Sequence, residues 1–225
     1  MKTLTIAFLK VAVSVAALAT DNSRTTDHDY SAPAPGSYSL PIIKPAADGA
    51  LLDSAGIPVR LAELTHDRIT VMSFIYTRCA ALEACPMATG VLMQLHRESA
   101  EDPALAKQLR LVSLSFDPAN DAPDRMAAYS RLASSRTNAA PWHFLTTRSQ
   151  AELQPILDAY GQAVDQKLDP NDPSGPLNHT LRVFLVDAMG NIRNIYSSAT
   201  LDVRLVLADV KTLTMEQIHS RRTDE

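Results

Sequence analysis

The sequence predicts an α/β fold in which a central mixed β-sheet is flanked by helices, and three observations indicate it. Apolar runs rich in β-branched residues alternate with segments of helical periodicity, which is typical of parallel strands joined by helices. A tight-turn signal joins the last two apolar runs and adds an antiparallel edge. The chain has 46% hydrophobic and 20% charged residues, the balance of a globular protein that can bury one core.

The first elements follow from turn signals and apolar patterns. Turn signals at Asp48-Gly49 and Ala55-Gly56 predict an N-terminal hairpin extension with arms at residues 51–52 and 59–61. Residues 69–76 form a nearly continuous apolar run, as expected for a strand buried on both faces. After a short loop, Pro86 suits the first turn of a helix that continues to about Glu98.

The second half of the chain repeats this alternation. Residues 109–116 alternate in polarity and predict a second central strand, and residues 168–176 hold three prolines and a glycine and predict a loop. The same patterns predict helices over residues 121–132, 150–160 and 201–213, and strands over 142–145, 181–187 and 192–197. This order, with a cysteine loop after a central strand and at the start of a helix, is the thioredoxin-like arrangement.

Composition divides the chain into four parts. Residues 1–19 carry Lys2, an apolar stretch and a small-x-small site, which predicts export by a signal peptide that is cleaved or kept as an N-terminal anchor. Residues 20–45 are rich in Ser, Thr, Asp and Pro and predict a flexible linker. We expect the folded domain over residues 46–215 and a C-terminal tail over 216–225.

The chemistry is expected at the two cysteines, Cys79 and Cys85, which lie between the buried strand and the helix start. The N–H groups and dipole of a helix N-terminus favour thiolate, which is both a nucleophile and a soft metal ligand suited to Cu(I) or Zn(II). A disulfide between them would close a very short loop. A pair of buried, inert cysteines is the other interpretation.

His179 and Asp117 complete the candidate site. His179 precedes a strand expected to lie near the cysteine-bearing strand, and a set of two cysteines and one histidine could hold copper in either oxidation state. Asp117 ends the second central strand. Its carboxylate either orients a ligand and tunes the local charge, or caps a turn or helix.

Three motifs together resemble the Sco/SenC family over residues 40–213. They are Phe74-Ile75-Tyr76-Thr77-Arg78-Cys79 with Cys85-Pro86, then Ser115-Phe116-Asp117-Pro118 through Asp121-Ala122-Pro123, and finally Leu177-Asn178-His179-Thr180. The resemblance implies a thioredoxin-like domain that binds copper through Cys79, Cys85 and His179, with Asp117 at a family acidic position. It also implies a protein client such as a cytochrome c oxidase subunit, whose CuA site receives copper or has its thiols reduced.

Members of this family are held at the outer face of a membrane, which implies a periplasmic location or the outer face of the inner membrane. The chain departs from the usual C-x-x-x-C-P spacing, because five residues separate its cysteines.

The sequence is also compatible with other functions. The fold and the loop position also suit an exported thiol–disulfide oxidoreductase with Cys79 and Cys85 as its redox pair, although C-x-x-C is the spacing that most favours this chemistry. A peroxiredoxin-type enzyme is disfavoured because its Pro-x-x-x-Thr-x-x-Cys pattern is absent. A net charge of −4 without a long block of one sign argues against a nucleic-acid partner.

Overall fold

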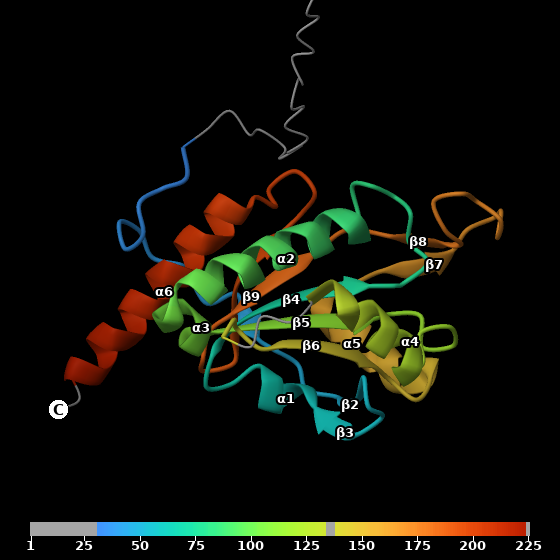
Figure 1. Cartoon of the computed structure of the whole chain (residues 1–225), viewed down its shortest axis with the longest axis horizontal. Helices are drawn as coiled ribbons and strands as arrows, with labels where there is room; N and C mark the ends of the chain where they lie inside the picture. The colour runs from blue at the N-terminus through green and yellow to red at the C-terminus, as the bar shows by residue number, and fades with distance from the viewer. Residues whose placement is uncertain (1–30, 134–137, 224–225) are drawn as a thin grey trace, which may run out of the picture.

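A mixed sheet forms the centre of the computed structural model of the protein, which describes residues 31–133 and 138–223 (Figure 1). Its strands are β1 (Lys44–Pro45), β2 (Ala50–Asp53), β3 (Pro58–Arg60), β4 (Ile69–Ile75), β5 (Leu109–Ser115), β6 (Trp142–Thr146), β9 (Val183–Val186) and β10 (Asn191–Tyr196). They lie in the order β1-β10-β9-β4-β5-β6-β2-β3. The predicted export segment over residues 1–19 lies outside the described residues.

The two predicted central strands lie side by side. β4 pairs in parallel with β5 from Ile69 opposite Leu109 to Ile75 opposite Ser115, and antiparallel with β9 on its other side. Every residue of β4 is buried, which explains why its sequence is nearly continuously apolar. The predicted hairpin is also confirmed, because β2 pairs antiparallel with β3.

Helices cover both faces of the sheet (Figure 1). One apolar cluster contains residues of α2 (Cys85–Glu101), α3 (Pro103–Gln108) and α6 (Val203–Thr223), together with Val71 and Leu111 of the sheet. The other contains residues of α1 (Leu61–Leu64), α4 (Pro123–Tyr129) and α5 (Gln150–Tyr160), together with Met72 and Val112. Alternate residues of the same strands therefore enter opposite layers, and the predicted thioredoxin-like α/β class is confirmed.

A small hairpin extends the fold beyond the end of β4. It consists of β7 (Val164–Gln166) and β8 (Leu177–His179), which pair antiparallel with Val164 opposite His179. The loop between them is the predicted proline-rich segment. Figure 1 shows this hairpin beside the loop that joins β4 to α2.

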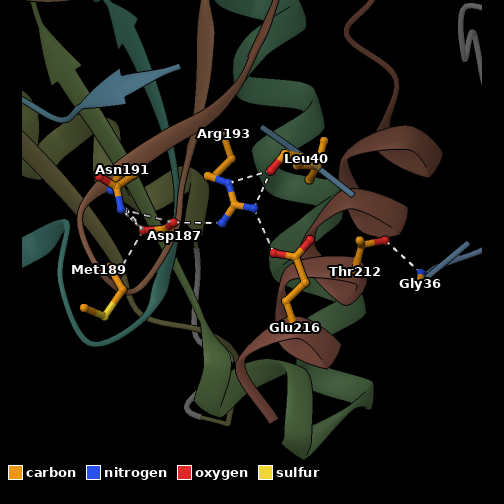
Figure 2. A network of polar contacts seen from close by, with 8 residues as sticks. All are labelled: Gly36, Leu40, Asp187, Met189, Asn191, Arg193, Thr212 and Glu216. Carbon is orange, nitrogen blue, oxygen red and sulfur yellow. Dashed lines mark hydrogen bonds and ion pairs between the residues drawn. The ribbon is translucent and has the colours of Figure 1, made fainter. Parts of the chain in front are cut away.

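The N-terminal segment packs on the domain earlier than the expected linker boundary at residue 45. Gly36 N donates to Thr212 Oγ1 over 3.0 Å, and Leu40 is buried. Figure 2 shows Arg193 joining Leu40 O to two carboxylates, at 2.9 Å from Asp187 Oδ2 and 2.8 Å from Glu216 Oε2. The composition of this segment gave no sign of these contacts because their partners lie more than 150 residues away in the sequence.

The C-terminal end also differs from the expected tail. α6 continues to Thr223, well past the predicted end at residue 213. Its extension contains no proline or glycine, and Glu216 is held by Arg193. Across the described ranges, no helix is long and apolar enough to cross a membrane.

Candidate metal centre

The end of β4 and the start of α2 place the two cysteines. After β4 ends at Ile75, the backbone turns so that Cys79 N donates to Tyr76 O over 3.2 Å. Cys85 is the first residue of α2, followed by Pro86, which matches the expected helix start. Both cysteines are free, with Cys79 half-buried and Cys85 only 3% exposed.

His179 at the end of β8 brings its ring to both sulfurs. Its Nε2 lies 3.7 Å from Cys79 Sγ and 3.5 Å from Cys85 Sγ, and the three ligand atoms all lie within 4.8 Å of one another. His179 Nδ1 lies 3.3 Å from Leu177 O. With the proton on Nδ1, the Nε2 lone pair faces the sulfurs and can bind a metal, whereas with a proton on Nε2 the ring donates to the Cys79 thiolate.

Two aromatic rings hold the imidazole in this orientation. Tyr76 meets His179 edge-on at a centroid distance of 5.4 Å, and Phe116 lies at 5.1 Å with the planes tilted by 46°. Both aromatic residues are almost completely buried. They follow β4 and β5, and their contact with His179 was not expected because β8 is far away in the sequence.

The geometry suits a soft metal ion. A trigonal site with metal–sulfur bonds of about 2.3 Å and a metal–nitrogen bond of about 2.0 Å separates sulfur from nitrogen by about 3.7 Å. The separations in the protein are 3.5 and 3.7 Å. Two sulfurs and one imidazole nitrogen are ligands that Cu(I) and Zn(II) accept and that Mg²⁺ or Ca²⁺ do not prefer.

The two thiols have opposite environments. Hydrogen bonds from Cys85 and His179 stabilise the thiolate of Cys79 and lower its pKa to about 4. The pKa of Cys85 is raised, because its thiol donates to the Cys79 thiolate and because it is buried. In the metal-free protein, Cys79 is therefore the accessible thiolate and Cys85 the buried thiol.

Asp117 lies beside the site and acts on a neighbour of Cys79. Its Oδ2 accepts from Arg78 Nη2 over 2.8 Å, and its Oδ1 accepts from Asn120 Nδ2 over 2.8 Å. Its contacts thus combine the two interpretations from the sequence. It closes a local turn with Asn120, and it holds the side chain of the residue before Cys79.

Asp121 is a further residue at the site whose contacts sequence reasoning missed. Its carboxylate is completely buried and accepts from Thr77 N over 2.9 Å, from Thr77 Oγ1 over 2.5 Å and from Ser115 Oγ over 2.6 Å. These bonds tie the backbone two residues before Cys79 to the end of β5. The presence of Asp121 in the same short motif as Asp117 was the available signal.

The loop between β7 and β8 packs on the cysteine loop. Ala80 N donates to Ser174 O over 3.1 Å, and a Cβ at Gly175 would lie 2.0 Å from Tyr76 Oη. Gly175 also has a φ of +104°, which L side chains rarely adopt. Glycine is therefore required where this loop crosses Tyr76.

The family model and the solved structures that match this chain indicate one family. A search of curated proteins gives no match. The ScoI structure from Arabidopsis thaliana with copper bound is 18% identical, with a TM-score of 0.63 over 76% of this chain and 98% of that one. A SCO1/SenC family lipoprotein from Bacillus anthracis is 21% identical, with a TM-score of 0.62 over 76% and 95%. BsSco, a member of the Sco family of cytochrome c oxidase assembly proteins, is 22% identical, with a TM-score of 0.61 over 78% and 98%. The SCO1/SenC family model matches residues 47–215, and the chain belongs to this family.

Proposed function

We propose that the protein binds one copper ion through Cys79, Cys85 and His179 and delivers it during cytochrome c oxidase assembly, with the CuA site as recipient. The observation that carries the proposal is the convergence of two sulfurs and a ring nitrogen within 4.8 Å. It is supported by the copper in the related ScoI structure and by the oxidase-assembly role given to BsSco.

The exposure of the two thiols suits a transferable ion. Cys85 and the two aromatic rings are buried on one side of the site, whereas Cys79 is half-buried and so partly accessible to solvent. An incoming thiolate or imidazole of a partner can therefore replace Cys79 first while Cys85 and His179 still hold the copper. Copper binding requires deprotonated ligands, so it releases protons and weakens at low pH.

The test is Cu(I) binding by the reduced protein in competition with a chromogenic chelator. We expect one Cu(I) per chain, and we expect Cys79→Ala, Cys85→Ala and His179→Ala each to lose stoichiometric binding. His66→Ala is the matched control, because His66 is exposed and lies at the other end of β4. Spectra of the Cu(II) form should show sulfur and nitrogen ligation. Unchanged stoichiometry in the three site variants would refute the copper proposal.

A second candidate is reduction of a disulfide in the client, and the different burial of the two cysteines favours it. The Cys79 thiolate would attack the client disulfide and form a mixed disulfide, and Cys85 would then displace the second client thiol. The client gains two electrons and two protons, and Cys79 and Cys85 become a disulfide. With a disulfide peptide as substrate, Cys85→Ser should accumulate the mixed disulfide at Cys79. Failure of the metal-free protein to reduce the peptide would exclude this candidate while leaving copper delivery intact.

Export and attachment at the outer face of a membrane complete the proposal. They are supported by the composition of residues 1–19 and by the lipoprotein from Bacillus anthracis. Fractionation of expressing cells, with N-terminal sequencing of the mature protein, tests both points. Recovery of the uncleaved protein in the cytoplasm would refute them.

A further inference from the structure

A cavity of about 610 Å³ opens at the end of the sheet opposite the cysteine site. Arg68 directly precedes β4, Trp142 begins β6, and α2 and α3 contribute His96 and Lys107, so the cavity lies at the starting ends of the parallel strands. The cysteines follow the other end of β4. The cavity is therefore separate from the candidate metal centre, and its volume is in the range of small-molecule sites.

The charges at this cavity have one sign. Its lining contains Arg68 and Lys107 but no aspartate or glutamate. Within the described ranges, the ion pairs found pair neither cation with a carboxylate. Arg68 adds to burial in lowering the pKa of Arg110, and the carboxylate of Asp67 partly opposes this shift. An anion in the cavity would therefore meet two cations of the lining.

Trp142 supplies the aromatic part of the lining, with its indole stacked on Phe144 at a centroid distance of 4.8 Å. The indole of Trp142 lies beside the buried imidazole of His96, with ring centroids 5.8 Å apart. Trp142 Nε1 donates to Ser113 Oγ over 3.1 Å, which fixes the orientation of the indole.

Hydrogen bonds also hold the surrounding backbone and one of the cations. Asn138 Nδ2 donates to Ala100 O over 3.2 Å, and Arg68 Nη1 donates to Ala106 O over 3.4 Å. Arg68 keeps further guanidinium donors for a ligand, since the side chain carries five. The indole of Trp142 and the guanidinium of Arg68 are thus positioned in advance, which lowers the entropy lost on binding.

We propose that this cavity binds a small organic anion whose oxyanion group lies between Arg68 and Lys107 and whose flat ring packs against Trp142. A guanidinium recognises the paired oxygens of a carboxylate or phosphate, and an ammonium adds a mobile positive charge. Aromatic packing against the indole selects a ring over a bare inorganic ion.

The test uses phenyl phosphate as the probe and tryptophan fluorescence as the readout. Trp142 is the single tryptophan of the chain, so its emission reports on this cavity. We expect a saturable change with a Kd below about 1 mM, which corresponds to about 4 kcal/mol of binding free energy. Inorganic phosphate should bind at least tenfold more weakly, and benzyl alcohol should give no saturable change.

Variants of the two cations test whether Arg68 and Lys107 bind the anionic group of the probe. Lys107→Glu, at an exposed position of α3, and Arg68→Gln should each weaken phenyl phosphate binding at least tenfold. Lys211→Gln on the exposed side of α6 is the control and should bind as the wild type does. Cys79→Ala should also retain binding, which separates this proposal from the copper proposal.

Three outcomes would overturn the inference. The first is no saturable change with phenyl phosphate up to about 10 mM, which is only about 3 kcal/mol of binding free energy. The second is unchanged affinity in both Arg68→Gln and Lys107→Glu. The third is equal affinity for inorganic phosphate, which would remove the role given to Trp142.

Discussion

The carboxylate of Asp121 provides a stringent test of how the cysteine loop is held, and Asp121→Ala is the perturbation. Removing it leaves three donors without their acceptor, namely Thr77 N, Thr77 Oγ1 and Ser115 Oγ. The two hydroxyls can turn toward other acceptors, but the part-buried Thr77 N–H is fixed by the backbone and cannot. Each unsatisfied buried group costs about 1–3 kcal/mol, and bonds to a charged acceptor lie at the upper end.

We therefore expect Asp121→Ala to lower the free energy of unfolding by about 3–5 kcal/mol. Asp121→Asn should cost less, about 1–2 kcal/mol, because its amide oxygen can keep Thr77 N and its amide group can donate to Thr77 Oγ1. Urea denaturation of the reduced protein measures both values. Asp124→Asn is the matched control, since Asp124 is exposed at the start of α4 and should change stability by less than about 0.5 kcal/mol.

A copper measurement separates positioning from general stability. Thr77 lies two residues before Cys79, so loosening it lets the Cys79 sulfur move away from Nε2 of His179. We expect Asp121→Asn to weaken Cu(I) binding under conditions in which the protein remains folded. An Asp121→Ala protein within about 0.5 kcal/mol of the wild type, with unchanged Cu(I) affinity, would refute the role of this carboxylate.

Three further predictions follow from other contacts. Gly175→Ala should destabilise the protein by at least about 2 kcal/mol in thermal unfolding, because the added Cβ would meet Tyr76. Gly90→Ala on α2 is the control and should be neutral or stabilising by up to about 1 kcal/mol. Equal effects of the two substitutions would contradict the close packing of Gly175 on Tyr76. The pKa of Cys79 is lowered to about 4, so it stays ionised well below the pH range of an ordinary thiol, and its alkylation rate in the metal-free protein should change little between pH 8 and 6. A tenfold fall per pH unit would show an ordinary thiol, and Cys85 should react slowly throughout. Arg193→Met should lower the free energy of unfolding by about 3 kcal/mol, because it leaves the buried carboxylate of Asp187 without its cation. It also removes the bond to Leu40 O, so the N-terminal segment should become the first site of limited proteolysis. Resistance equal to that of the wild type would argue against this attachment of the N-terminal segment.

Sequence patterns predicted the elements that are determined locally. Apolar runs placed β4 and β5 almost to the residue, and helical spacing placed α5 with its ends at Gln150 and Tyr160. Helix α1, helix α3 and the β7–β8 hairpin were missed, because the helices have four and six residues and each strand of the hairpin has three, which is too short for a periodic pattern to be recognised. These short elements depend on tertiary contacts for their stability.

The site was predictable only in part for the same reason. The sequence named Cys79, Cys85 and His179 through their positions beside strands, and the fold brings these three together. It could not show that Tyr76 and Phe116 flank the imidazole, or that Asp121 bonds Thr77. Those contacts join segments that are distant in the sequence, and each depends on the register between β4 and β5.

The unusual cysteine spacing has a physical explanation in this fold. Cys79 is fixed by the end of β4 and Cys85 by the first turn of α2, so the five residues between them need only connect two fixed points. A turn closed by Ala84 N and Ala81 O, 3.0 Å apart, takes up the extra length, and Leu82 is left 79% exposed. The sulfurs can therefore keep their positions while the loop length varies. The longer loop therefore changes mainly the surface near the half-buried Cys79, where it adds an exposed leucine.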